Sequence, residues 1–235
     1  MRELKVPERA LVIVAHPDDI DFGMAGSIAR LTQAGAQVTY CLVTSGEAGP
    51  PDEADRGELR LLREAEQRSA ASVVGVDDVR FLGYPDGRVE SSLALRRDLS
   101  RLIRDVRPDL VISQSSDRNW DRVYFSHPDH LAVGEATACA VYPDSRNWWS
   151  HPELLDEGFQ PHTVARMWVA GLEPNLFIDV TDVFDLKVKA LLSHTSQVGA
   201  RNVAELLRNW AAANAAQAGW ASDRLAESFR EIDAL

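Results

Sequence analysis

The chain has 235 residues, of which 45% are hydrophobic and 26% are charged. These values are typical of a soluble globular protein and exclude the disordered and fibrous classes. Lys and Arg total 25 and Asp and Glu total 36, so the formal net charge is −11 at pH 7. This acidic balance argues against a nucleic-acid partner, because phosphate backbones bind basic surfaces.

Cysteine content and hydropathy indicate the compartment. Cys41 and Cys139 are too few for a disulfide framework and favour a reduced setting. The first ten residues lack the apolar region of a secretion signal, and no later stretch approaches the roughly 18 apolar residues of a membrane-spanning helix. We therefore expect a cytoplasmic protein without a transmembrane segment.

The first half of the chain alternates short apolar runs with amphipathic segments. Fully apolar, β-branched runs are typical of buried parallel strands, whereas a spacing of three to four residues predicts helices. The predicted elements are a strand at 10–15, a helix at 24–35, a strand at 37–46, a helix at 57–74 and a strand at 79–87.

The second half continues the alternation, with an irregular stretch at 142–163. Its predicted elements are helices at 93–108, 130–141, 182–194 and 203–219 and strands at 109–114, 163–171 and 175–181. The pattern predicts a Rossmann-like α/β fold, a three-layer αβα sandwich with a mostly parallel sheet. No repeat or linker interrupts it, so we expect residues 1–235 to form a single domain.

The first candidate site follows the first predicted strand. AHPDD places His16, Asp18 and Asp19 directly after that strand, where open parallel sheets bind their ligands. His16 and Asp19 can converge on one metal ion, which leaves Asp18 for other chemistry. A capping Asp beside a turn His gives the same short pattern, so this motif alone does not establish a metal site.

A second motif lies in the corresponding loop after another strand. HPDH supplies His127, Asp129 and His130 at the start of a predicted helix. A capped helix with Asp129 as its N-cap is the structural alternative. However, βαβ winding can bring the two loops together, and three protein ligands with an open water position are the pattern of catalytic zinc. The two motifs together therefore predict a zinc site.

With these motifs the chain resembles the LmbE-like or PIG-L superfamily of zinc-dependent N-deacetylases. The resemblance spans nearly the whole chain, and the pairing of AHPDD with HPDH is its most specific part. The matching segments occur in the same order as in the family: AHPDD, the RxxE of Arg63 and Glu66, LGYPDG at 82–87, HPDH, and the stretch at 179–197.

The resemblance implies a role for each residue of the first motif. It assigns Zn²⁺ to His16, Asp19 and His130 and makes Asp18 the general base that activates water. The implied reaction is hydrolysis of the N-acetyl group of an N-acetylglucosamine-type glycoside or related amino sugar, with release of acetate and a free amine. The expected partner is therefore a small N-acetylated sugar or glycoside.

The remaining site residues have more than one interpretation. The resemblance implies that His127 stabilises the oxyanion or helps to deliver a proton, and that Asp129 orients His127. It also places Arg63 and Asp86 against the substrate. Arg63 paired with a glutamate of its own helix, and Asp86 as an ordinary turn residue, are the structural alternatives.

Two other functions remain open from the sequence: a metal-dependent phosphohydrolase that uses the same residues, and a non-catalytic Rossmann-like binding protein. A homo-oligomer is compatible with the chain, because such assemblies are common among soluble enzymes of this size.

Three further histidines and three loop tryptophans are weaker candidates for the site. A lone histidine is more often structural or on the surface than a ligand, and of His151, His162 and His194 the last is the best candidate to line the pocket. An apolar or sugar-stacking wall is one interpretation of the tryptophans and a structural role is the other; they are Trp120, Trp148 and Trp149.

Overall fold

The computed structural model describes residues 4–50, 53–198 and 202–235. A seven-stranded sheet has the strand order β3-β2-β1-β4-β5-β7-β6. Its strands are β1 (Arg9–Val14), β2 (Gln37–Leu42), β3 (Asp78–Phe81), β4 (Leu110–Gln114), β5 (Arg166–Ala170), β6 (Leu176–Asp179) and β7 (Ala226–Asp233).

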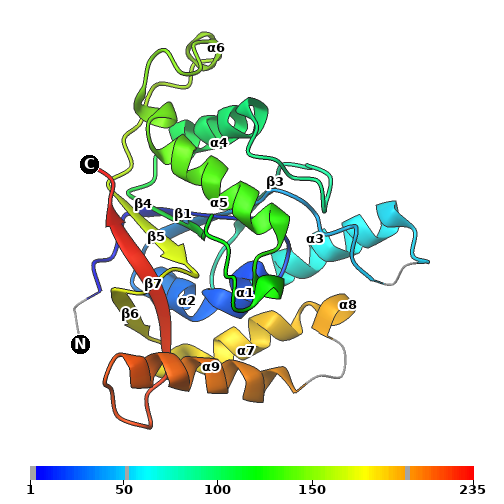
Figure 1. The fold of residues 1–235 in the computed structure, drawn as a ribbon, viewed down its shortest axis with the longest axis vertical. Coiled ribbons are helices and arrows are strands. Elements are labelled where there is room, and N and C mark those ends of the chain that lie inside the picture. The colour runs from blue at the N-terminus through cyan, green and yellow to red at the C-terminus, as the bar shows by residue number, and fades with distance from the viewer. Residues whose placement is uncertain (1–3, 51–52, 199–201) are drawn as a thin grey trace.

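Helices cover both faces of this sheet, with α4 and α5 on one side and α7 and α9 on the other (Figure 1). In the described part of the chain, none has the length and apolar character needed to cross a bilayer. The α-helices are α1 (Asp19–Gly23), α2 (Ala25–Gln33), α3 (Arg56–Val73), α4 (Leu93–Val106), α5 (Pro128–Val141), α6 (Glu153–Asp156), α7 (Phe184–Leu192), α8 (Thr195–Val198) and α9 (Val203–Gln217). Short 3₁₀ helices are η1 (Val123–Phe125), η2 (Asp144–Arg146) and η3 (Thr181–Val183).

The sheet is mixed but mostly parallel. β1 pairs in parallel with β2 and β4, and the parallel part extends to β3 and β5. β7 then pairs antiparallel with both β5 and β6. The predicted Rossmann-like α/β fold with a mostly parallel sheet is therefore confirmed.

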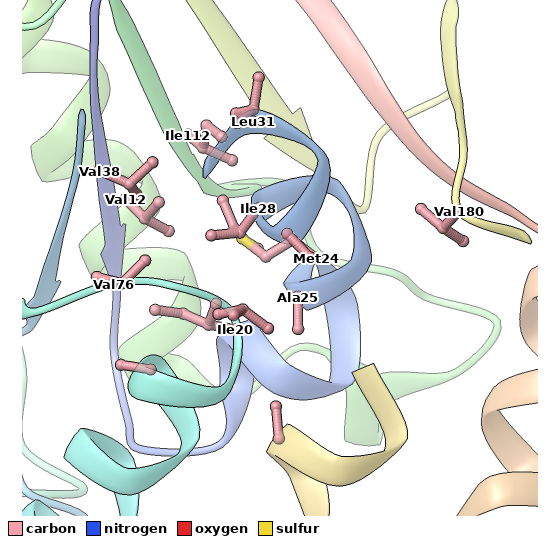
Figure 2. Packing of buried hydrophobic residues seen from close by; sticks show 14 of the residues in the cluster. Val12, Ile20, Met24, Ala25, Ile28, Leu31, Val38, Val76, Ile112 and Val180 are labelled. Atoms are coloured by element: carbon pink, nitrogen blue, oxygen red, sulfur yellow. The ribbon is translucent and has the colours of Figure 1, made fainter. Parts of the chain in front are cut away.

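The central strand β1 contributes to a hydrophobic core on each face of the sheet. Val12 and Val14 pack with α2, α3, α7 and α9, whereas Leu11 and Ile13 pack with α4 and α5. Side chains alternate along a strand, so a strand covered on both faces is apolar at every position. Figure 2 shows the first core, where Val12 lies close to Ile28 of α2.

The C-terminal strand β7 is an element that the sequence patterns do not predict. Its sequence AESFREID consists largely of residues with weak β propensity. Tertiary contacts hold it in place, because the buried Glu227 accepts hydrogen bonds from the backbone N–H groups of Gly26 at 3.0 Å and Ser27 at 2.6 Å. A charged residue thus joins β7 to the start of α2.

The same carboxylate forms a buried ion pair with α7. Lys187 Nζ lies 2.5 Å from Glu227 Oε1, and each side chain is only 3% exposed. Lys187 Nζ also donates to the backbone carbonyl of Phe22 at 2.8 Å. Buried charges are tolerated only when they are paired and hydrogen-bonded. This pair therefore fixes the positions of α7, β7 and the end of α1 relative to one another.

Replacing Lys187 by Met should lower the free energy of unfolding by roughly 3 to 5 kcal/mol, because it leaves the Glu227 carboxylate buried without its cation. Urea denaturation followed by circular dichroism measures this loss. Lys189→Met, at an exposed position two residues further along α7, is the matched control and should change stability by no more than about 0.5 kcal/mol. Equal effects of the two substitutions would contradict this role of the ion pair.

Candidate metal centre and active site

The two sequence motifs meet at the carboxyl ends of β1 and β4. These strands are parallel neighbours, although 95 residues of chain and two other strands separate them in sequence. β2 and β3 continue the sheet beyond β1, and β5 continues it beyond β4, so the strand order reverses here. Open α/β sheets bind ligands at such switch points, outside the carboxyl ends of the strands.

Two close contacts fix the end of β4, one against the end of β1 and one against α5. The backbone N–H of Ala15 donates to Gln114 Oε1 at 3.0 Å. A Cβ at position 134 would lie 2.7 Å from the backbone oxygen of Gln114, so only the glycine found there lets α5 approach β4 this closely. Gly134 is about one helical turn beyond His130, and this close approach therefore sets the position of the His130 ring.

His16, Asp19 and His130 converge at this point. His16 Nδ1 lies 3.2 Å from His130 Nε2, His130 Nε2 lies 3.1 Å from Asp19 Oδ1, and His16 Nδ1 lies 3.6 Å from Asp19 Oδ2. Ligands held tetrahedrally about 2.1 Å from a zinc ion are roughly 3.4 Å apart. The three side chains therefore have both the donor types and the spacing that suit one zinc ion.

The far side of the His16 ring is held by two carboxylates. His16 Nε2 lies 3.1 Å from Asp129 Oδ2 and 3.1 Å from Asp86 Oδ1. A proton on Nε2 satisfies both carboxylates and leaves Nδ1 to face Asp19 and His130. This is the common arrangement in which a carboxylate fixes the tautomer of a metal-binding histidine.

Asp129 therefore contacts a different histidine from the one that the resemblance implies. Its carboxylate accepts from the backbone N–H groups of Gly87 at 2.8 Å and Val89 at 3.1 Å and faces His16, not His127. His127 is the N-cap of α5, and its Nδ1 accepts from the Asp129 backbone N–H at 3.2 Å. Because Nδ1 accepts, neutral His127 carries its proton on Nε2.

Asp18 lies between the two metal-site residues of the first motif. Its φ of 82° is unusual for a residue other than glycine, and its backbone N–H donates to Gln67 Oε1 at 3.0 Å. Burial, reinforced by the negative charge of Asp19, raises the pKa of Asp18 to about 7, although His194 acts in the opposite direction. A carboxylate with such a pKa suits general base chemistry at neutral pH.

Arg63 is buried next to the loop after β2. Its guanidinium donates to the backbone oxygen of Gly46, while its Nε and Nη2 have no partner in the part of the chain that the structure describes. Glu66 instead accepts from Thr195 and from Ser196 of α8. The alternative in which Arg63 pairs with Glu66 of its own helix is therefore not what the structure shows.

His194 has a structural position, as the default interpretation of a lone histidine predicts. Its side chain is fully buried, and its Nε2 lies 2.8 Å from Asp21 Oδ2. Gln67 Nε2 donates to the same oxygen at 3.0 Å, so Asp21, Gln67 and His194 form a buried network behind Asp18. Sequence reasoning missed Gln67; its position one residue after the RxxE motif was the available signal.

The remaining weaker candidates lie apart from the convergent group. His162 Nε2 lies 2.8 Å from the backbone oxygen of Pro108, and His151 lies beside Asp144 at 3.7 Å. Three loop tryptophans are exposed: Trp120, Trp148 and Trp149. For His151 and His162 the structure thus supports the default structural interpretation.

The fold and the convergent side chains define a Rossmann-like α/β protein with a candidate metal centre at its switch point. A family model described as "PIG-L: GlcNAc-PI de-N-acetylase" matches residues 11–141, a span that contains every predicted site residue. The chain belongs to the PIG-L family, and the resemblance inferred from its motifs is confirmed.

Individual relatives agree with this assignment. The chain is 32% identical over 196 residues to a diacetylchitobiose deacetylase of Thermococcus kodakarensis, covering 81% of this chain and 70% of the relative. It is 33% identical over 210 residues to a "Probable N-acetyl-alpha-D-glucosaminyl L-malate deacetylase 2" of Bacillus subtilis, covering 86% and 90%. The solved N,N'-diacetylchitobiose deacetylase of Pyrococcus horikoshii, in complex with an inhibitor, superposes with a TM-score of 0.89 at 29% identity, covering 97% of this chain and 85% of the other.

Metal affinity should depend steeply on pH because of His16. Burial lowers the pKa of His16, but the carboxylates of Asp129, Asp19 and Asp86 outweigh burial and raise the pKa to about 12. The metal-free ring therefore carries two protons near neutral pH, and a metal on Nδ1 must displace one of them. Raising the pH favours that displacement, so affinity should rise about tenfold per pH unit.

Competition with a chelator of known proton affinity, between about pH 6 and pH 8, measures this dependence. His162→Gln, which removes a histidine remote from the metal centre, should keep the wild-type slope. An affinity for Zn²⁺ that stays constant over this range would show that His16 carries no displaceable proton.

Proposed function

We propose that the protein is a zinc-dependent N-deacetylase that hydrolyses the N-acetyl group of an N-acetylglucosamine-type glycoside or related amino sugar. The observation that carries the proposal is the convergence of ligand atoms of His16, Asp19 and His130 within 4.8 Å of one another. Membership of the PIG-L family supports it, as do two relatives whose names describe deacetylases of amino-sugar compounds.

The donor set supports zinc as the metal. Two imidazole nitrogens and one carboxylate oxygen, with a further position left open, match catalytic zinc sites. A zinc ion held by His16, Asp19 and His130 supplies Lewis-acid chemistry, which polarises a carbonyl oxygen and makes water acidic near neutral pH. Asp129 and Asp86 would fix the His16 ring in the tautomer that this binding requires.

In the proposed reaction, Asp18 takes a proton from the attacking water. Because its pKa is about 7, a large fraction of Asp18 is ionised at neutral pH and can accept a proton. The protonated carboxyl group can afterwards give that proton up. Water attacks the acetamide carbon, the C–N bond breaks, and the amine leaves with a proton. Asp18, which then holds the proton taken from water, is the group available to deliver it.

His127 is suited to stabilise the oxygen of the acetamide as it becomes negative. Burial and the neighbouring His16 lower the pKa of His127, so its ring is neutral at pH 7. With Nδ1 accepting from the Asp129 backbone, Nε2–H is the group available to donate. A preorganised donor of this kind stabilises the transition state more than the bound substrate.

Arg63 and Asp86 remain proposed contacts of the substrate. The two N–H-bearing atoms of Arg63 that lack a partner among the described residues support this role, because a hydroxyl or phosphate oxygen would satisfy them. The Asp86 carboxylate accepts from the Ala48 backbone at 2.8 Å and contacts His16, and its side chain is 9% exposed. A sugar hydroxyl could therefore bind Asp86 only at the carboxylate lone pairs that these two contacts leave free.

Replacing Asp18 by Asn should lower kcat for acetate release by about 10²- to 10⁴-fold while one zinc per chain is retained, because the amide cannot accept the proton of water. Acetate is measured over a panel of N-acetylglucosamine derivatives, and zinc by elemental analysis. His130→Ala should instead lose both the zinc and the activity. Asp77→Asn, at an exposed acid outside the site, is the control and should behave like the wild type.

Three outcomes would count against this proposal. Wild-type rates in Asp18→Asn would remove Asp18 from the reaction. Two metal ions per chain together with phosphate release would favour the phosphohydrolase alternative. Bound zinc without acetate release from any acetylated sugar would favour the non-catalytic binding protein.

A further inference from the structure

A large cavity adjoins the candidate metal centre on the side of α9. Its volume is about 680 Å³, and Asp19 and His130 form part of its wall. Of the described residues, those that line it do not include Asp18, His127, Asp86 or Arg63. Asp19 and His130 thus separate this space, which we call the α9 cavity, from the part of the site proposed to meet the sugar.

The wall of the α9 cavity has an apolar side and a polar side, and the polar side is formed largely by the loop after β4. Its apolar side chains come from α1, from α5 and from the buried face of α9, and they include Phe22, Leu131, Leu207, Trp210 and Ala211. Leu207 and Ala211 are 1% and 2% exposed and form a rigid floor, whereas Trp210 is 41% exposed. The Trp210 and Phe22 rings lie together with their centroids 6.3 Å apart.

The buried charges on this wall offer little attraction to a charged ligand. Lys187 and Glu227 both line the cavity, but they neutralise each other at 2.5 Å and are also held by backbone groups. Asp117 and Arg122 also line the cavity, but they belong to the loop after β4 and lie away from its apolar side on α9. The side of Asp18, Asp86 and Arg63 carries three charged groups. Sugar hydroxyls suit that charged side, and a hydrocarbon group suits the α9 cavity.

A sugar that carries an acyl group on its nitrogen would place its two parts, the sugar and the acyl chain, in these two different environments. The amide is planar, so the sugar and the acyl chain extend in different directions from the C–N bond. An acetyl methyl group is about as large as a water molecule, which occupies about 30 Å³. The α9 cavity, at about 680 Å³, is far larger than an acetyl group needs.

We propose that the α9 cavity receives N-acyl chains longer than acetyl and that the protein removes such chains from amino sugars. This inference rests on the proposed deacetylase function. Water adds to the acyl carbon, the C–N bond breaks, the amine leaves with both protons of the water, and the chain leaves as a carboxylate. Only the length of the chain distinguishes this reaction from deacetylation.

The test compares glucosamine carrying N-acetyl, N-butanoyl and N-hexanoyl groups, with the zinc-loaded protein and detection of the released amine. The value of kcat/KM should rise along the series by roughly fourfold for each methylene buried. Trp210→Ala should lower the ratio of N-hexanoyl to N-acetyl hydrolysis. Trp220→Ala, which removes a tryptophan packed on Phe177 outside the cavity wall, should leave that ratio unchanged.

A second series keeps the N-acetyl group and lengthens an alkyl group at the anomeric oxygen. If that series, and not the acyl series, gains from chain length in a way that depends on Trp210, the cavity holds the aglycone and the proposal is wrong. A fall in kcat/KM with each added acyl carbon, while acetate is still released, overturns the proposal and leaves the deacetylase function intact. Absence of hydrolysis from every compound, N-acetyl included, would overturn both.

Discussion

The parallel pairing of β1 with β4 is the constraint on which the rest of the structure depends. It brings together His16 and His130, which are 114 positions apart in the chain. A slip of one residue in this pairing would shift the two loops relative to each other. Asp109 Oδ2, just before β4, accepts from the Arg9 backbone N–H at 3.0 Å. At the other end of the pair, Gln114 Oε1 accepts from the Ala15 backbone N–H at 3.0 Å, and these specific contacts oppose the slip.

Carboxylates concentrate negative charge around His16. Asp19, Asp86 and Asp129 surround one imidazole ring, and Asp18 lies next to Asp19 in the chain. Burial, reinforced by the like charge of Asp19, raises the pKa of Asp18. A divalent cation would relieve this repulsion. Because a metal bound only by the folded state stabilises that state, a metal bound at this site would couple its binding to folding.

The sequence predicts the parts of the protein that depend on local patterns. The apolar runs of β1 and β4 and the positions of AHPDD and HPDH at their ends were sufficient to infer the sheet and the approach of the two motifs, whereas the choice of His16, Asp19 and His130 came from the family resemblance. The partners of individual side chains were not predictable in this way. Asp129 contacts His16, Asp21 contacts His194, and Glu227 holds β7, because the neighbours of these carboxylates come from segments far away in the sequence.

The central claim is that His16, Asp19 and His130 hold one zinc ion. X-ray absorption spectroscopy of the zinc-loaded protein tests it most directly. We expect two imidazole nitrogens with the remaining ligands oxygen, at about 2.0 to 2.2 Å. A shell containing sulfur, or one without histidine, would contradict it.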